Sequence, residues 1–265
     1  MIKMVALDLD GTLVEHRPDG SYVPPKTLEL FEELIGKGMY IGIDTGRAHW
    51  EMIKILKDLK IGADSLFPSF FVAEENHIFW KNGGEFIPQS DHNDPMRKML
   101  DDFAMDIAEE TRSILGFLRE HSAGPEFWVI FSTFALEMTY ADVESAQKAL
   151  DLLPEYFGER DFKLHRNTVQ VQVLPSNTGK GRTLLSVAKH AGIQPTEILT
   201  MGDSLNDSDM LDDLYGFEAA TVSNADPRVL DLIKSRNGYI AKGVAGEGVR
   251  ETIEYYRENG RLAVK

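Results

Sequence analysis

Apolar and polar residues follow two patterns along the chain, and the first of them predicts a parallel sheet. Apolar runs at 4–9, 39–44 and 70–73 have the length of buried strands. Between them, apolar side chains recur every three or four residues over 24–36 and 48–59, as on one face of a helix. Strands that alternate with helices form a parallel sheet covered on both faces. This pattern predicts an α/β fold with a doubly wound, Rossmann-like core.

The second pattern is that of a smaller α+β unit. One long amphipathic helix is predicted over 94–120, followed by strands at 127–132 and 135–140. A helix at 142–157 and a hairpin at 162–174 complete the order helix, strand, strand, helix, strand, strand. Such an order builds a separate layer and does not extend a parallel sheet.

After this hairpin the first pattern returns. It predicts two further strands and four further helices, at 197–201 and 217–222 and at 180–191, 206–214, 226–234 and 248–258. A chain of 265 residues is long enough for two cores. We therefore predict that 89–173 is an inserted domain, and that 1–88 and 174–265 together form the Rossmann-like core.

Composition narrows the classes of function. The formal net charge of −15 argues against non-specific binding to nucleic acid or to an anionic membrane, because both need a positive surface. The absence of cysteine excludes disulfides and thiol catalysis. No apolar stretch approaches the roughly 18 residues of a membrane span, and the N-terminus has no signal-peptide pattern. We expect a cytoplasmic protein, and the sequence sets no oligomeric state.

Two carboxylates follow the first predicted strand, in the segment Asp8-Leu9-Asp10-Gly11-Thr12. Ligands of an open α/β sheet bind beyond the carboxyl ends of its strands, and side chains two residues apart in a strand face the same way. One carboxylate can attack phosphorus, and the second can serve as acid and then as base. Two adjacent carboxylates also favour Mg²⁺. The structural alternative is a turn that uses Asp and Gly for its geometry.

Two further segments suit a phosphate group. Thr45 and Gly46 follow the second predicted strand, where a hydroxyl and backbone N–H groups could bind phosphate oxygens; a plain helix cap is the alternative. Lys180 stands at a predicted helix start, where its charge opposes the helix dipole unless it faces an anion. An exposed surface lysine is the alternative. The segment is not a Walker A loop, because Leu174 stands where that loop needs glycine.

A fourth segment, Gly202-Asp203-Ser204-Leu205-Asn206-Asp207, follows the strand predicted at 197–201. Its two aspartates surround a strand-to-helix turn. The EF-hand pattern fails, because Leu205 stands where a ligand is required. A capped helix start is the structural alternative. The seven histidines show no clustered spacing for zinc, and we interpret Gly243, Gly246 and Gly248 as a turn before the last helix.

Four such segments in this order resemble the haloacid dehalogenase superfamily. Its motifs correspond to D-x-D-G-T at 8–12, the hydroxyl of Thr45, the lysine at Lys180, and G-D-x-x-N-D at 202–207. The long insertion between the second and third motifs resembles the type-IIB cap of Cof-like and sucrose-phosphatase-like phosphatases. The resemblance implies a catalytic core with an inserted α/β cap.

The resemblance also implies a catalytic or metal-binding role for each acidic residue of the motifs. Asp8 would be the nucleophile and a metal ligand, and Asp10 the general acid and base, with its backbone carbonyl on the metal. Asp203 would be a further ligand, and Asp207 either a ligand or a residue that supports the ligands. The implied cofactor is Mg²⁺.

The remaining core motifs would bind the phosphoryl group. Thr45 and Lys180 would hold its oxygens, together with the Gly46 amide. Asn206 would contact the phosphate or orient Lys180. Such roles agree with the physics of phosphoryl transfer, where positioning and charge neutralisation supply most of the catalysis.

The hairpin predicted at 162–174 alternates apolar and polar residues, so one face should pack on the cap helices. In type-IIB relatives the other face of the cap sheet covers the active site. His165, Gln170 and Gln172 lie on that face, and their amides and imidazole suit sugar hydroxyls. A solvent-facing sheet surface is the alternative interpretation.

These patterns together predict a Mg²⁺-dependent phosphatase that acts on a small phosphorylated metabolite, such as a sugar phosphate. A phosphomutase or phosphotransferase uses the same motifs, and a catalytically idle binding module could keep the fold. Every acidic motif position is present, which argues against the idle module. The asparagine-glycine pair that the subfamily has after its third strand is here Asn76-His77.

Overall fold

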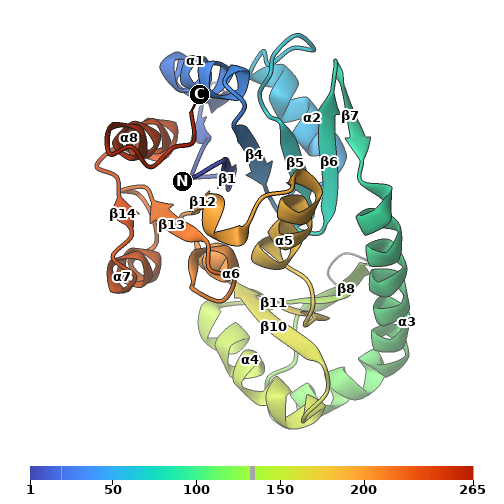
Figure 1. Ribbon diagram of the computed structural model, residues 1–265. Helices are drawn as coiled ribbons and strands as arrows, with labels where there is room; N and C mark the ends of the chain where they lie inside the picture. The colour runs from blue at the N-terminus through green and yellow to red at the C-terminus, as the bar shows by residue number, and fades with distance from the viewer. Residues whose placement is uncertain (19, 132–134, 265) are drawn as a thin grey trace. The chain divides into compact units, whose positions relative to one another are not determined.

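The alternation of strands and helices builds two units, which a computed structural model describes over residues 1–18, 20–131 and 135–264 (Figure 1). Contacts divide the chain into Met1–His92 with Gly179–Lys265, and Asn93–Thr178. The first unit is thus built from both ends of the chain, and the second is inserted between them.

The first unit, hereafter the core, contains an eight-stranded sheet in the order β14-β13-β12-β1-β4-β5-β6-β7. Its first six strands in that order are parallel, and β6 and β7 are antiparallel additions at one edge. Their bounds are β1 Met4–Leu7, β4 Tyr40–Asp44, β5 Phe70–Ala73, β6 His77–Asn82, β7 Glu85–Pro88, β12 Ile198–Met201, β13 Glu218–Thr221 and β14 Tyr239–Ile240. The central strands are buried, as expected for a sheet covered on both faces.

Helices cover both faces of this sheet (Figure 1). On one face lie α1 (Pro25–Gly36), α2 (His49–Asp58) and α8 (Ala245–Glu258), and on the other lie α5 (Lys180–Ala191), α6 (Ser208–Leu211) and α7 (Pro227–Ser235). Because side chains alternate along a strand, Val5 and Leu7 of β1 pack with the first set while Met4 and Ala6 pack with the second. Both faces of β1 are therefore covered, and its polar residues begin where the strand ends at Leu7.

A short hairpin follows β1 after the segment 8–14. It consists of β2 (Glu15–Arg17) and β3 (Gly20–Tyr22), which pair antiparallel outside the main sheet. Two 3-10 turns, Pro195–Glu197 and Leu205–Asp207, precede β12 and α6. The hairpin was not predicted from the sequence, because its strands are only three residues long and largely polar.

The second unit, hereafter the cap, packs two helices against one face of a four-stranded sheet. The helices are α3 (Ser90–Glu120) and α4 (Val143–Phe157), and the sheet has the order β10-β11-β9-β8. The strand bounds are β8 Phe127–Phe131, β9 Ala135–Thr139, β10 Phe162–Asn167 and β11 Gln170–Pro175. Leu136 and Val171 of the sheet join Ile114 and Leu153 of the helices in one buried cluster. The sheet face that bears Glu137 and Gln172 lies away from the helices.

Two segments of the core differ from the structure that the sequence predicted. The helix predicted at 206–214 is a 3-10 turn and one α-helical turn, which end at Leu211. The glycine run is not a turn before α8, because α8 begins at Ala245 and includes Gly246. A Cβ on Gly246 would lie 2.6 Å from Pro24 Cδ and 2.9 Å from the Leu13 carbonyl, so this glycine serves close packing.

The predicted strands 127–132 and 135–140 agree with β8 and β9, apart from residue 132, which lies outside the described residues. In the part of the chain that the structure describes, no helix combines the length and the apolar character that a membrane crossing requires.

Candidate active site

Three neighbouring strands of the core sheet bring distant motifs to one edge. β1 lies between β12 and β4, with Leu7 paired to Met201 on one side and to Ile43 on the other. Asp8 follows β1 directly, Thr45 follows β4, and Asp203 follows β12 after one glycine. The carboxyl ends of parallel strands are where ligands bind in open α/β sheets. The topology therefore places three of the four sequence motifs beside one another.

Lys180, the third motif, joins this edge from the first residue of α5. Its side chain is fully buried, and its Nζ donates to Asp8 Oδ1 at 2.5 Å and to Asp207 Oδ1 at 2.6 Å. Burial lowers the pKa of Lys180, but the charges of Asp207 and Asp8 outweigh burial and hold that pKa well above its ordinary value. Lys180 is thus a fixed ammonium group, which removes the penalty of its unfavourable place at a helix N-terminus.

Asp203 is held by the first motif. Thr12 Oγ1 donates to Asp203 Oδ1 at 2.8 Å, across 191 residues of sequence. Gly11 has a φ of +84°, and a Cβ at that position would lie 2.4 Å from Asp203 Oδ2. Glycine is therefore needed in D-x-D-G-T both for its backbone conformation and for the space that Asp203 occupies.

Asp8, Asp203 and Asp207 each offer a carboxylate oxygen, and these three atoms lie within 4.8 Å of one another. Burial raises the pKa of Asp8 well above its ordinary value, against the charge of Lys180. Burial also raises the pKa of Asp203, with a further contribution from the charge of Asp207. Three carboxylate oxygens gathered in this way are a donor set suited to Mg²⁺.

The three carboxylates are not equivalent as metal donors. Asp207 Oδ1 accepts from Lys180, and its Oδ2 accepts from the backbone N–H groups of Asp203 and Ser204, both at 2.9 Å. Both oxygens of Asp207 thus already order the turn and the lysine. Asp8 and Asp203 are the better candidates for direct ligands, with Asp207 as their support.

Asp10, the second carboxylate of the first motif, faces two basic side chains. Arg47 donates to it through Nε at 2.7 Å and through Nη2 at 2.8 Å, and His16 of β2 is hydrogen-bonded to its Oδ1. Burial raises the pKa of Asp10, but the hydrogen bonds from Arg47 and His16 outweigh burial, so that pKa lies below its ordinary value. No role was predicted for Arg47 or His16 from the sequence, although Arg47 directly follows the Thr45-Gly46 motif.

The predicted phosphate-binding residues have different surroundings. Thr45 is buried, and its Oγ1 accepts a hydrogen bond from the backbone N–H of Arg47 at 3.2 Å. Asn206 lies in the 3-10 turn before α6, where its Oδ1 accepts from the Ser204 hydroxyl. The contacts described for Lys180 are with the two aspartates, so its orientation is explained without Asn206.

The position of Lys180 also depends on a turn after β5. Asn76 is buried, and its Oδ1 accepts from the backbone N–H of Gly179 at 3.3 Å, directly before Lys180. Thr183 Oγ1, one turn into α5, donates to the Glu75 carbonyl at 2.7 Å. Glu75 has a positive φ of 59°, so the turn is tight. The asparagine of the incomplete Asn76-His77 pair therefore helps to fix the start of α5.

Asp44, the last residue of β4, is a further carboxylate at this edge. It is fully buried, and neither of its oxygens has a hydrogen-bond partner in the described part of the chain. Burial raises its pKa well above the ordinary value, and the charge of Lys180 opposes this only in part. Asp44 is consequently a buried carboxyl group near the lysine that holds its proton more tightly than an ordinary aspartate, and the sequence did not reveal it.

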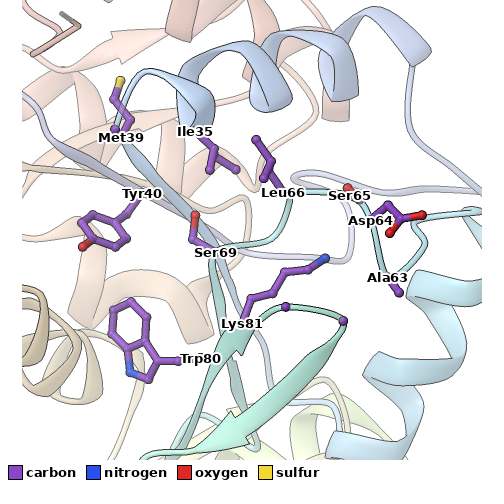
Figure 2. Close-up of a pocket in the computed structure, with 13 residues that line it drawn as sticks. Ile35, Met39, Tyr40, Ala63, Asp64, Ser65, Leu66, Ser69, Trp80 and Lys81 are labelled. Carbon is purple, nitrogen blue, oxygen red and sulfur yellow. The ribbon is translucent and has the colours of Figure 1, made fainter.

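A cavity of about 630 Å³ lies in the core but away from these residues (Figure 2). It opens beside Tyr40, the first residue of β4, whereas the candidate site lies beyond the last residue of that strand. Figure 2 shows Trp80 and Lys81 of β6 on its wall, with Ser69 nearby. Its lining includes none of the motif residues, so its size does not identify the active site.

The polar residues predicted for the cap form a ladder on the sheet face opposite α3 and α4. Gln170 and Gln172 each donate from Nε2 to Glu137, at 2.9 and 2.7 Å. His165 of β10 is paired with Gln172 of β11. Glu137 was not predicted as part of this face. The two amides hold its carboxylate, and their carbonyl oxygens add to an acceptor-rich surface.

The fold and this site define a class of protein with a carboxylate-lined candidate active site in a Rossmann-like core and with an inserted second unit. Sequence profiles agree: that of the haloacid dehalogenase-like hydrolases matches residues 5–121, and that of sucrose-6F-phosphate phosphohydrolase matches residues 140–257. The chain belongs to the haloacid dehalogenase superfamily and is a phosphoric monoester hydrolase.

Individual relatives cover different shares of the chain. A phosphoglycolate phosphatase from Methanococcoides burtonii is 40% identical over 102 residues, which are 38% of this chain and 42% of that protein. A 5-amino-6-(5-phospho-D-ribitylamino)uracil phosphatase from Bacillus subtilis is 23% identical over 96% of this chain and 97% of its own. The sucrose-phosphatase of Synechocystis, solved with sucrose and phosphate, has a TM-score of 0.67 at 18% identity, covering 97% of this chain and 99% of that one.

Proposed function

We propose that this phosphatase hydrolyses a small phosphate monoester, of the sugar-phosphate class, through an aspartyl-phosphate on Asp8, and that it requires Mg²⁺. The observation that carries the proposal is the contact of Lys180 with Asp8 inside a cluster of three carboxylates. A buried ammonium beside a strand-end carboxylate suits the attack of that carboxylate on a dianionic phosphate.

The chemistry follows from the two aspartates of the first motif. A carboxylate oxygen of Asp8 bonds to phosphorus as the ester P–O bond breaks, and the leaving oxygen takes a proton from Asp10. Water then attacks the aspartyl-phosphate and gives a proton to Asp10, which releases phosphate and restores Asp8. Each half of the reaction leaves Asp10 in the protonation state that the other half requires.

Asp10 must change partners in this scheme. In the structure its carboxylate accepts from Arg47 and His16, which lowers its pKa and favours the base form. A bound phosphate would attract Arg47 by a bidentate contact and weaken the hold on Asp10. Arg47 therefore joins Lys180 and Thr45 as a candidate phosphate-binding residue.

Asp8 and Asp203 would hold the Mg²⁺, with Asp207 supporting them. When bound, the cation would neutralise the phosphoryl oxygens and lower the pKa values of the crowded carboxylates. The sugar-phosphate class is supported by the acceptor-rich face of the cap sheet, since sugar hydroxyls are hydrogen-bond donors. The Synechocystis sucrose-phosphatase, which shares this fold, was solved with sucrose and phosphate, a sugar and the group that such an ester releases.

The proposal is tested by phosphate release from a panel of sugar phosphates and from p-nitrophenyl phosphate, with Mg²⁺ and with a chelator. Asp8→Asn keeps the size of the side chain and removes the nucleophile, so kcat should fall by several orders of magnitude. A variant that retained more than about a tenth of kcat would contradict the assignment. Phosphate released without any acceptor sugar distinguishes hydrolysis from transfer by a phosphomutase.

A further inference from the structure

β8 of the cap is an edge strand made entirely of exposed apolar residues. Its sequence is Phe-Trp-Val-Ile-Phe over Phe127–Phe131, and it is the last strand in the sheet order β10-β11-β9-β8. All five side chains are between 36% and 53% exposed. Among the described residues, β9 is the strand that pairs with β8, and it lies along one side. The other side is the edge of the sheet, where strands of other chains can pair.

This strand differs from the other exposed apolar residues that the structure describes. Met105 on α3, for example, is 67% exposed, but no other exposed large apolar residue of the described chain lies within four positions of it. Scattered exposed apolar residues are ordinary, whereas a contiguous group marks an interaction surface. Edge strands usually carry a charge or a proline that prevents pairing, and β8 contains neither.

We propose that β8 is a self-association surface, through which two copies of this chain join their cap sheets edge to edge about a two-fold axis. An antiparallel pair of identical strands is self-complementary when the axis passes through the central residue. With Val129 at the axis, Phe127 lies opposite Phe131 of the other copy, and Trp128 lies opposite Ile130. Each cross-strand pair is then aromatic or β-branched, the combinations that stabilise sheets.

The distribution of charge allows a second copy to approach at this strand. The chain carries a net charge of −15, yet Phe127–Phe131 carries none. Glu137 of β9 is a carboxylate on a neighbouring strand, paired with Val129. With two β8 strands between them, Glu137 and its symmetry mate would be three strand spacings apart, about 14 Å. That exceeds the Debye length of about 8 Å at physiological salt.

The area of the surface sets the expected strength. Aromatic side chains have about 150–250 Å² to bury, so the observed exposed fractions leave roughly 400 Å² on the five residues of each copy. Two copies would bury at most about 800 Å² of side-chain surface, because pairing at the edge leaves part of each strand face exposed; this is less than the 1,200–2,000 Å² of stable complexes. The dimer should therefore be weak and concentration-dependent. The hydrogen bonds between the two strands would fix their alignment and contribute less to affinity.

The absence of cysteine from the chain gives a direct test of the register. Antiparallel partners have Cα atoms about 4.5–5.5 Å apart, within the range of a disulfide. Val129→Cys should therefore cross-link to itself under mild oxidation. Phe127→Cys should not, because residues 127 of the two copies would be about 14 Å apart. Met105→Cys is the control for an exposed cysteine elsewhere in the cap.

The purified full-length variants would be oxidised at equal concentration and separated on a non-reducing gel, with circular dichroism to check the fold. Faster dimer formation by Val129→Cys than by both other variants is the expected result. Equal rates for all three, or a faster rate for Phe127→Cys, would overturn the proposal.

Sedimentation velocity supplies a second measurement that needs no cysteine. The wild-type chain should show a rising dimer fraction between about 1 and 300 μM, the range of a weak complex. Val129→Lys places two like charges at the axis and should remain monomeric, whereas Met105→Lys should behave like the wild type. A wild-type chain that stays monomeric throughout, or a Val129→Lys variant that still dimerises, would show that β8 is not a self-association surface.

Discussion

At the scale of single residues, the candidate site is ordered by charge pairs that compete with one another. Lys180 is shared by Asp8 and Asp207, while Asp10 is shared by Arg47 and His16. Lys180 and Asp10 can each exchange one of these partners for a bound anion. Whether a side chain acts as an acid or as a base should therefore depend on its hydrogen-bond partner at that step as well as on its residue type.

Arg47→Ala removes both guanidinium contacts with Asp10. We expect kcat/KM to fall roughly 10- to 100-fold, the usual result of misplacing a catalytic group by about 1 Å. Arg47→Lys keeps the charge but not the two-pronged geometry, so its loss should be intermediate. Steady-state kinetics with p-nitrophenyl phosphate test this, with Arg250→Ala on α8 as a control. Unchanged kinetics for Arg47→Ala would exclude a role for this arginine.

Asp44 should make stability depend on pH. Burial raises its pKa in the folded protein above the unfolded value of about 3.9, so the folded state binds the proton more tightly. Stability is then lost as pH rises from the unfolded pKa through the folded one. Asp44→Asn cannot ionise, so the Tm of the variant minus the Tm of the wild type should increase as the pH rises. Unfolding curves in chelator at several pH values test this, and a constant difference would count against it.

At the scale of elements, the strand ends were predictable and the contacts between motifs were not. Buried strands such as β1 and β5 have runs of apolar residues that end at a polar one, which fixes where the chemistry begins. The antiparallel β6 and β7 were missed, because the sequence there is half polar and joined by a turn. The acceptors for Arg47 were missed because nothing local indicates that residues 37 positions apart meet.

The cap hairpin carries the prediction that belongs to this scale. Gln172→Ala removes the donor to Glu137 Oε2, which leaves that half-buried carboxylate unpaired on one oxygen. If the polar ladder binds the leaving group, kcat/KM for the preferred sugar phosphate should fall roughly 5- to 150-fold, which corresponds to about 1–3 kcal/mol. His165→Ala should behave similarly.

The control for these two cap variants is a second substrate, p-nitrophenyl phosphate. Hydrolysis of p-nitrophenyl phosphate should be nearly unchanged in both variants, since that ester has no hydroxyl groups to bind. Equal losses with both substrates would indicate a defect in folding. No loss with either would mean that this face of the cap does not bind the leaving group.

At the scale of the whole molecule, the metal should couple the site to the stability of the core. The carboxylates that gather at the sheet edge come from both ends of the chain, at residues 8 and 203. Any ligand that binds them together binds only the folded state, and so stabilises it. The two halves of the core are therefore held by packing and, when Mg²⁺ is present, also by the site.

Mg²⁺ at about 100 times its Kd should stabilise the protein by about 2.7 kcal/mol. For a chain of this size that is a rise in Tm of roughly 5–10 °C. Asp203→Ala should lose most of this rise and need more Mg²⁺ for activity. Differential scanning fluorimetry with a Mg²⁺ titration measures the shift without any substrate. A wild-type Tm that does not respond, or an Asp203→Ala variant that responds fully, would refute the assigned ligand.

The close approach of Gly11 to Asp203 has a consequence for how the motifs can be exchanged. The glycine of the first motif lacks a side chain because the aspartate of the fourth occupies that space, and Thr12 beside it donates to the same carboxylate. The two segments behave as one unit although 191 residues separate their bonded side chains. A side chain introduced at Gly11 would therefore displace the carboxylate of Asp203, so the first segment tolerates change only as far as the fourth can move with it.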